Sequence, residues 1–425
     1  MEQPNIPRSP YPRVVIVGAG FGGINLVKAL HNKPFQVVLI DKNNYHLFQP
    51  LLYQVATAGL EPSSIAFPVR GLFKKKHNLI FRLAEVKAVQ PAANTLQTSI
   101  GDIHYDYLVI GTGSISNFFG NKNFETYGSG MKTLYEAVGI RNFGLKQLEE
   151  ALLLTDPKEK NEFLNIVIVG GGPTGVELAG ALAEFKRTIF VQDYPEISPE
   201  LMNIYLIEAA PRLLANMSEQ ASAQTHKFLS GMGVKIMLKT MVKDYNGEKA
   251  TLDNGQEIYT RSFIWSAGVK GNAPEGLPPE AIAKGNRIEV NEFNYVKGYE
   301  NIFAIGDVAQ MTNDPRYPKG YPMLAQVAIQ QGRNLGANLL RLQKKQPLKP
   351  FWYKDKGTLA TIGRNKAVAD LGKMHLHGFP AWIIWMVVHL LFLIGFRNKL
   401  VVFINWVYSY LTYDRGTRIL LKRHI

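Results

Sequence analysis

The stretch IVIVGGGPTGVELAGALAEF, residues 166–185, joins an apolar run, a tight glycine turn and a helical pattern in direct succession. A buried strand that ends in such a turn and continues into a helix is the first half of a dinucleotide-binding βαβ unit. The chain makes the same succession earlier, in VVIVGAGFGGINLVKAL at residues 14–30. We therefore expect two dinucleotide-binding units in one chain.

The first glycine turn consists of Gly18, Gly20 and Gly23 in the spacing GxGxxG. The first glycine permits the tight turn, the second lets a phosphate approach the backbone, and the third packs the helix on the strand. Asp41 ends the next predicted strand, where an acid accepts a hydrogen bond from a ribose hydroxyl. Since strand, turn, helix, strand and acid occur in order, the pattern predicts a working site.

The second turn repeats this spacing with Gly170, Gly172 and Gly175. Glu208 ends the following strand, and residues 186–203 before that strand predict an extended helix and a loop. An acid at this position favours the free 2′-hydroxyl of NAD over the 2′-phosphate of NADP. Arg212 lies close in sequence and leaves the strictness of that preference open.

The composition restricts the chemistry further, because the 425 residues include no cysteine. Disulfides, cysteine-ligated metal clusters and dithiol relays are excluded, and we expect no metal site. A protein that holds two dinucleotides can pass a hydride from one to the other, and a nicotinamide and a flavin are the obvious pair. A duplication with one inactive site is less favoured, because both copies keep their glycines and acids.

Three further stretches carry a family resemblance: YDYLVIGTGS at 105–114, IFAIGDVA at 302–309 and AQVAIQQG at 325–332. With them, the sequence resembles the type II NADH:quinone oxidoreductases, which are two-dinucleotide-binding flavoproteins. The resemblance runs from Val14 to about Lys373 and more loosely to the C-terminus. It implies an α/β fold with two nested Rossmann-type domains, as in glutathione-reductase-like flavoproteins, plus C-terminal amphipathic membrane-binding helices.

The resemblance also implies which residues hold the cofactors, with FAD on the first glycine turn and NADH on the second. The expected FAD contacts are Gly18, Gly20, Gly23, Asp41, Gly111, Gly113, Asp307 and Ala325. The expected NADH contacts are Gly170, Gly172, Gly175 and Glu208. Residues 43–59 are expected in part along the flavin, although core packing explains them equally well.

AQVAIQQG matches the family's quinone-site motif AQxAxQQG and predicts a helix start after Pro322. A helix N-terminus at the N1 and O2 edge of the flavin stabilises the anionic reduced form. Gln326 and Gln330 lie four apart, on one helical face, and both can reach a quinone or flavin carbonyl.

Glu177 follows the second turn, and we place it in the first turn of a helix, where the helix dipole stabilises a carboxylate. The resemblance implies a further role between nicotinamide, flavin and quinone, delivering protons to the reduced quinone. Lys373 aligns roughly with a family lysine near the quinone pocket. A solvated lysine at a membrane-facing edge explains it equally well.

The expected domain plan follows the repeats and the changes of pattern along the chain. Residues 234–258, with their NG turns, predict a β-meander. The plan is a disordered lead-in at 1–13, an FAD-binding domain at 14–120 and 290–345, an NADH-binding domain at 160–285, and a C-terminal membrane-association region at 350–425.

The C-terminal region is apolar and flanked by cations. Residues 378–396 contain no Lys, Arg, Asp or Glu, and four of the five tryptophans lie in or near this region. Aromatic residues with flanking cations suit helices that lie on an anionic bilayer, which we favour over a spanning helix. The resemblance implies peripheral attachment to the membrane, often as a homodimer. Because residues 1–13 are proline-rich and contain no secretory signal, we expect attachment to the cytoplasmic face of the inner (plasma) membrane.

The sequence thus predicts a respiratory-type, non-proton-pumping enzyme whose FAD accepts a hydride from NADH and reduces a lipid quinone, ubiquinone or menaquinone. Sulfide:quinone oxidoreductases and disulfide reductases work through cysteines and are excluded. Two alternatives stay open: an NADH-responsive FAD protein with a mainly binding role, similar to apoptosis-inducing factor, and a reductase with another acceptor. The net charge of +14 is attributed to cofactor phosphates and lipid, and no nucleic-acid partner is expected.

Overall fold

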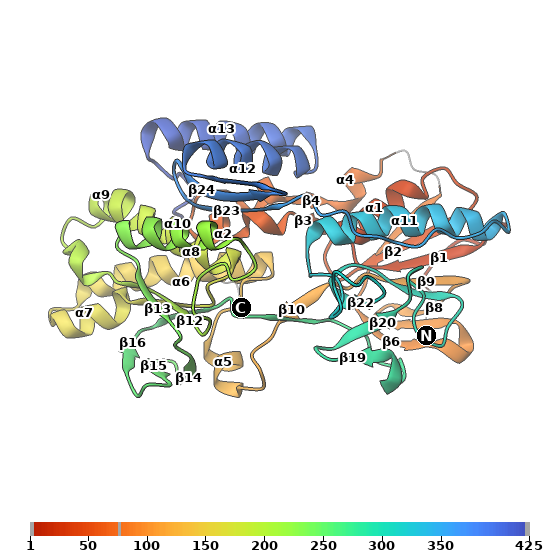
Figure 1. The fold of residues 1–425 in the computed structure, drawn as a ribbon, viewed down its shortest axis with the longest axis horizontal. Coiled ribbons are helices and arrows are strands. Elements are labelled where there is room, and N and C mark those ends of the chain that lie inside the picture. Colours follow the sequence, from red (N-terminus) through yellow and green to blue (C-terminus); the bar gives the residue numbers. More distant parts are fainter. Residues whose placement is uncertain (1–3, 75–77, 421–425) are drawn as a thin grey trace. The chain divides into compact units, whose positions relative to one another are not determined.

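The computed structural model describes residues 4–74 and 78–420, and its chain divides into two compact units (Figure 1). Unit 1 consists of Met1–Leu47, Phe67–Ile115 and Val269–Asp355. Unit 2 consists of Phe48–Ala66, Ser116–Gly268 and Lys356–Ile425. Each unit is assembled from three separate segments, so the first fold is interrupted and later resumed.

Unit 1 is built on a parallel sheet with the strand order β21-β9-β1-β2-β5. These strands are β1 (Arg13–Val17), β2 (Gln36–Asp41), β5 (Leu79–Leu83), β9 (Tyr107–Ile110) and β21 (Ile302–Ala304). β1 is buried from Val14 to Val17, as expected for an apolar strand covered on both faces. Its neighbours β2 and β9 lie on opposite sides of it, so the strand order reverses at β1. Open α/β sheets bind nucleotides at the carboxyl ends of the strands where this reversal occurs.

Two helices of unit 1, α1 (Phe21–Ala29) and α11 (Ala325–Gln343), pack at very close range. A Cβ added to Gly332 would lie 2.4 Å from the carbonyl oxygen of Gly22, so only glycine fits there. Unit 1 is completed by two small sheets, β6 (Val86–Gln90) with β7 (Thr95–Thr98) and β8 (Gly101–His104), and β19 (Ile282–Ala283) with β20 (Arg287–Val290) and β22 (Ala309–Met311).

The first described residues form no helix or strand, but their backbone is hydrogen-bonded to unit 1. The carbonyl of Pro4 accepts from Nε of Arg82 at 2.9 Å, and that of Pro7 accepts from Nε2 of Gln36 at 2.7 Å. Residues 1–3 of the expected lead-in lie outside the described residues.

Unit 2 repeats the architecture with the parallel strand order β13-β12-β11-β17. Its strands are β11 (Ile166–Val169), β12 (Ile204–Glu208), β13 (Lys235–Leu238) and β17 (Ser262–Trp265). The meander predicted for residues 234–258 is present only as β14 (Val242–Tyr245), β15 (Lys249–Leu252) and β16 (Glu257–Tyr259). The first part of that prediction was wrong, because Lys235–Leu238 pair in parallel with β12 as β13. The prediction of two nucleotide-binding folds is confirmed.

Helices surround the sheet of unit 2. They are α2 (Leu52–Ala56), α3 (Pro62–Ile65), α5 (Lys122–Tyr127), α6 (Leu134–Leu153), α7 (Pro157–Leu164), α8 (Pro173–Phe185), α9 (Val191–Asp193) and α10 (Glu219–Gly231). A π-helical turn, Lys186–Phe190, continues α8 into α9, as the longer spacing before β12 predicts. α6 begins with a reciprocal capping box between Thr133 and Glu136, which fixes its first residue.

The C-terminal part of unit 2 is a three-stranded sheet followed by two helices. The elements are β23 (Thr358–Gly363), β24 (Lys366–Leu371), β25 (Met374–His377), α12 (Phe379–Phe392) and α13 (Phe396–Thr412). Figure 1 shows α12 and α13 side by side next to the β23–β24 hairpin. The apolar stretch 378–396 is not one helix, because α12 ends at Phe392 and Gly395, at φ +85°, turns the chain into α13.

Among the described residues, no helix combines the length and the apolar character needed to cross a membrane.

One glycine allows this C-terminal sheet to lie directly on α8. A Cβ added to Gly180 would lie 1.8 Å from the carbonyl oxygen of Ile362 in β23. α8 and β23 therefore meet backbone to backbone, and this contact places Thr361 beside α8.

We expect Gly180→Ala to lower the melting temperature by several degrees, since overpacking of this kind costs about 1–3 kcal/mol. Thermal unfolding of the flavin-loaded protein measures the effect. Gly139→Ala is the control, because a Cβ at this exposed position in α6 meets no atom within 4 Å and alanine favours a helix. Equal melting temperatures for the two variants would contradict the close contact.

Candidate functional site

The two glycine turns have the same backbone geometry. Gly18 and Gly170, which follow β1 and β11, have φ values of +103° and +110°, a region that side chains other than glycine rarely adopt. Cβ atoms added to Gly23 and Gly175 would each lie 1.9 Å from the carbonyl oxygen of the first glycine of their own turn. The first and third glycines are therefore required by the fold itself.

The second glycine of each turn has a different role. A Cβ added to Gly20 or Gly172 would meet no atom within 4 Å, so the space before each turn is open. These residues are the N-caps of α1 and α8, and no side chain of the described residues caps either helix. Open space in front of uncapped helix amides fits a pyrophosphate, which a Cβ would displace.

The acid after each second strand supports the glycine turn. Asp41 accepts hydrogen bonds from the backbone N–H groups of Ala19 and Asn43, both at 2.7 Å. Glu208 accepts from Gly171 at 2.5 Å and Ala210 at 2.7 Å. A carboxylate has about four acceptor positions, so both acids keep capacity for a ribose hydroxyl.

Asp307 lies in a turn of unit 1 that is held from two sides. Its Oδ2 accepts from the hydroxyl of Ser114 at 2.5 Å, and the N–H of the neighbouring Gly306 donates to Oε1 of Gln331 at 2.7 Å. Gln331 is buried in α11. The AQVAIQQG stretch therefore positions the Asp307 turn, a role that the sequence analysis missed.

The two glutamines expected to act together have different surroundings. Gln330 exchanges two hydrogen bonds with the backbone of Lys354, donating to its carbonyl at 3.0 Å and accepting from its N–H at 3.1 Å. Oε1 of Gln326 is buried and has no hydrogen-bond partner among the described residues. Gln326 therefore remains able to bind a ligand, whereas the amide of Gln330 is largely used by the fold.

His46 is a further polar residue beside the first turn that the sequence analysis did not select. It is 1% exposed, and its Nδ1–H donates to the carbonyl of Ala19 at 2.8 Å. Burial lowers its pKa to about 4, so the ring is neutral. Its Nε2 accepts from none of the described residues. The signal in the sequence was a lone histidine in an apolar stretch directly after Asp41.

Unit 2 contains an aromatic cavity of about 140 Å³. Its walls come from α2, α8, β23, α12 and α13, and include Tyr53, Glu177, Trp382, Trp385 and Trp406. Trp406 donates to Oε1 of Gln54 at 2.8 Å, and Nε2 of Gln54 donates to the hydroxyl of Tyr53 at 2.8 Å. This connection fixes α13 against α2 on one side of the cavity.

Two acids line this cavity, Glu177 and Glu184, and Glu177 is the more buried of them at 9% exposed. Burial raises its pKa to about 8, although the backbone N–H of Thr361 donates to it at 3.4 Å. The indole N–H of Trp385 also lowers this pKa slightly, but its geometry falls short of a hydrogen bond. Glu177 is the fifth residue of α8, outside the first turn, so the expected stabilisation of a carboxylate by the helix dipole is outweighed by burial.

Three arginines that the sequence analysis left out of the site line the same cavity: Arg187, Arg364 and Arg415. The guanidinium of Arg364 lies over the rings of Tyr410 and Tyr413, 3.8 and 4.0 Å from their centroids. Arg415 donates to the carbonyl of Thr57 at 2.9 Å and reaches Glu184 at 3.5 Å. Its pairing partners lie far away in sequence, so no local pattern indicates it.

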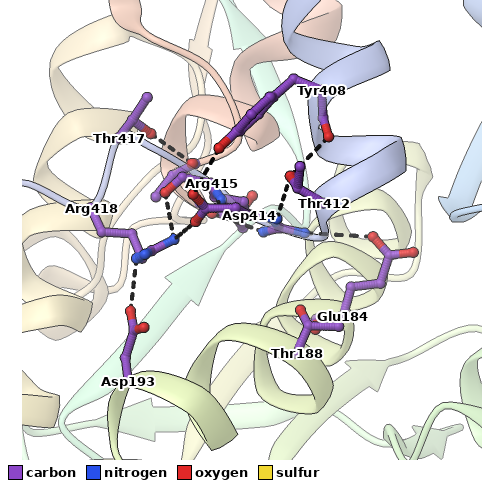
Figure 2. Close-up of polar contacts among 11 residues, drawn as sticks. Glu184, Thr188, Asp193, Tyr408, Thr412, Asp414, Arg415, Thr417 and Arg418 are labelled. Atoms are coloured by element: carbon purple, nitrogen blue, oxygen red, sulfur yellow. Dashed lines mark hydrogen bonds and ion pairs between the residues drawn. The ribbon is translucent and has the colours of Figure 1, made fainter.

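The chain after α13 is tied back to unit 2, as Figure 2 shows. Arg418 forms an ion pair with Asp193 at 2.7 Å and another with Asp414 at 2.6 Å. The hydroxyl of Thr417 donates to the carbonyl of Ala58 at 2.6 Å. The segment from Asp414 to Arg418 therefore closes one side of the unit.

Lys373 does not line this cavity. It lies in the turn between β24 and β25 and is exposed. Its expected role near a quinone is therefore not part of the proposal below.

Comparisons with known proteins agree with this geometry. Residues 12–332 match the family described as pyridine nucleotide-disulphide oxidoreductase, and residues 355–413 match the NDH2 C-terminal domain. The chain is 35% identical over 421 residues to the type II NADH:quinone oxidoreductase NdhA of Mycobacterium tuberculosis, covering 95% of this chain and 88% of that protein. It is 33% identical to Ndh of the same organism, covering 95% and 89%.

The chain belongs to the type II NADH:quinone oxidoreductase family.

Among solved structures, NDH2 of Plasmodium falciparum in complex with NADH matches this fold with a TM-score of 0.88 at 22% identity, over 97% of this chain and 100% of that one. The predicted family, fold class, enzyme activity and cofactors FAD and NADH are confirmed. This type II oxidoreductase is an enzyme, so the alternative with a mainly binding role is not supported.

The raised pKa of Glu177 predicts how its contribution to the stability of this oxidoreductase varies with pH. A free glutamate has a pKa of about 4.3, so between about pH 4.3 and 8 the native state binds one more proton than the unfolded chain. The stability that protonated Glu177 contributes is therefore complete below the pKa of the unfolded chain, and it is lost as the pH rises through the pKa of the native state. Glu177→Gln, which stays neutral, should gain stability relative to the parent as the pH rises.

Melting temperatures of the flavin-loaded parent and variant at pH 5, 7 and 9 test this expectation. A difference between variant and parent that does not change with pH would show that Glu177 is ionised in the native protein.

Proposed function

We propose that this NADH:quinone oxidoreductase binds FAD in unit 1 and NADH in unit 2, and receives the quinone head in the aromatic cavity beside Glu177. FAD would rest on Gly18, Gly20, Gly23, Asp41, Gly111, Gly113, Asp307 and Ala325. NADH would rest on Gly170, Gly172, Gly175 and Glu208. The open space at Gly20 and at Gly172 supports both placements.

When bound, the flavin supplies the redox chemistry, taking two electrons from NADH and giving them to the quinone. The residues of the chain would bind and orient the two cofactors and the quinone. In unit 1, Ser114 and Gln331 hold the Asp307 turn, while Gln326 offers an unpaired amide oxygen. The uncapped amides of α1 and α8 would face cofactor phosphates.

The proton chemistry is assigned to Glu177, and its burial in the aromatic cavity is the observation that carries this proposal. With a pKa of about 8, its carboxyl group is protonated at neutral pH and can donate. Reduction of a quinone to a quinol consumes protons as well as electrons, and Glu177 would supply a proton at the wall of the cavity. Trp385 lines this wall and stacks on His389 of the same helix, α12, with 4.1 Å between the ring centroids.

We expect Glu177→Gln to separate the two half-reactions. Anaerobic NADH should bleach the flavin at the parental rate, whereas reoxidation by a short-chain quinone should slow by about 10²-fold, a usual value for loss of a general acid. In the parent, reoxidation should slow as the pH rises through 8, because the acid form is lost, and the variant should lack this dependence.

Glu184→Gln serves as the control. Glu184 lines the same cavity on the same helix, but its carboxylate pairs with Arg415, so this variant should keep the pH dependence. Equal slowing of bleaching and reoxidation in Glu177→Gln would contradict a role limited to the quinone step.

We also propose that α12 and α13 lie on an anionic membrane surface. Their exposed apolar residues form one stripe on each helix: Ile383, Val387 and Leu391 on α12, and Phe396, Leu400, Phe403, Ile404, Val407 and Leu411 on α13. Leu391 is 67% and Phe396 82% exposed. A contiguous apolar face of this kind suits the interface of a bilayer.

The orientation of this face is fixed from the inner side. Asn398 is buried in α13 and donates to the carbonyls of Ser63 at 3.1 Å and Ser64 at 3.0 Å. Trp385 is buried on the inner side of α12. Pairing of two chains and attachment to the cytoplasmic face of the inner membrane stay predictions.

Replacing Leu391 and Val407 by glutamate should weaken binding to vesicles by at least tenfold, since each apolar side chain contributes about 1.5–3 kcal/mol when buried. Flotation with phosphatidylglycerol vesicles measures binding, and phosphatidylcholine vesicles test the need for anionic lipid. Leu153→Glu, at an 83% exposed position of α6, is the control. Undiminished flotation of the double variant would exclude this face.

A further inference from the structure

Unit 2 contains a second, larger cavity that the activity above does not use. Its volume is about 290 Å³, close to the lower limit of about 300 Å³ for small-molecule sites. Its walls come from α6, α7, α8 and β17 and are mostly apolar, with Ile140, Leu148, Phe163, Phe185 and Ile264 among them.

This cavity is distinct from the sites for NADH and quinone. It reaches Ile166 and Ser262, the first residues of β11 and β17, whereas Gly170 and Glu208 lie at the opposite ends of the parallel strands. Its lining and that of the aromatic cavity share Thr57.

A buried cation lines this apolar space. Arg141 of α6 is 4% exposed, and its Nε has no hydrogen-bond partner among the described residues. Burial lowers its pKa, and the charge of Glu61 opposes that change. Arginine nevertheless stays protonated in proteins, so the unsatisfied donor is costly where it stands.

The second arginine of the lining, Arg261, has an ion-pair partner, although its Nε also lacks a hydrogen-bond partner among the described residues. Arg261 forms an ion pair with Glu248 at 3.2 Å, and its guanidinium lies 5.5 Å from the ring centroid of Phe163. Among the described residues, Arg141 is therefore the lining arginine without an ion pair, although the charge of Glu61 acts on it.

We propose that this cavity binds an amphiphile with one carboxylate and one hydrocarbon chain, that is, a fatty acid. The carboxylate pairs with Arg141, because the planar guanidinium matches carboxylate geometry in a two-point contact. The hydrocarbon chain fills the space between the apolar side chains, where a water molecule would find few hydrogen-bond partners. A single negative charge matches Arg141, the lining arginine without an ion pair among the described residues.

Gly144 gives a way to block the cavity without disturbing the charge. It lines the cavity from α6, and a Cβ at this position meets no atom within 4 Å. A leucine there enters open space and improves the helix propensity of α6, so the variant is expected to fold.

The test titrates the full-length, FAD-loaded enzyme with cis-parinaric acid, a fluorescent fatty acid, with protein-free detergent as the blank. We expect saturable binding at one site, at least tenfold weaker in Arg141→Met and in Gly144→Leu, and displaced by hexadecanoic acid. Lys146→Met, an exposed charge on the same helix, should leave binding unchanged. NADH-dependent bleaching of the flavin in each variant shows that it is folded.

Four results would overturn the proposal: no saturable binding, parental affinity in both Arg141→Met and Gly144→Leu, displacement by hexadecanol as effective as by hexadecanoic acid, or displacement by a short-chain quinone. Displacement by hexadecanol would show that the carboxylate, and so the charge of Arg141, is not needed. Displacement by a short-chain quinone would assign the probe to the cavity of Glu177.

Discussion

The structure depends on one backbone contact that occurs twice. In each glycine turn, the start of the helix packs against the carbonyl group of the first glycine, which follows the strand. At both turns the third glycine leaves no room for a Cβ, which would lie 1.9 Å from that carbonyl oxygen. Because each helix begins so close to its strand, its first amides point across the open second glycine. The position of the acid on the next strand, bonded to the turn, follows from the same geometry.

Both units that contain this contact are assembled from separate segments of the chain. Each unit resumes after an interruption, so distant segments have to complete it, and they do so with further close contacts. Gly332 of α11 meets Gly22 of α1 in unit 1, and Gly180 of α8 meets Ile362 of β23 in unit 2. The second of these contacts brings Thr361 to Glu177 and so buries the carboxyl whose protonation the quinone step is proposed to use.

The elements that could be predicted are those whose signals are local. Both glycine turns, their strands, the acids Asp41 and Glu208 and the meander β14–β16 are encoded within short windows, and the structure contains them. The start of the expected meander, Lys235–Leu238, instead pairs with β12, a strand that the local pattern did not indicate as its partner. The state of Glu177 could not be predicted, because it depends on β23 and α12, far along the chain. Gln330 likewise looked free, since its partner Lys354 follows only after α11 has ended. Arg415 and His46 have partners in other segments, and a single sequence does not show such pairs.

The last part of the chain gives the enzyme an order of assembly. Trp382, Trp385, Trp406 and Arg415 all line the aromatic cavity, and all follow both glycine turns in the sequence. Both glycine turns precede this part of the chain, so a nascent chain has its nucleotide-binding strands before the C-terminal walls of the aromatic cavity. The same helices that form these walls also carry the apolar stripe. The C-terminal walls of the cavity and the apolar stripes that are proposed to contact lipid therefore belong to the same two helices, so a chain without α12 and α13 would lack both.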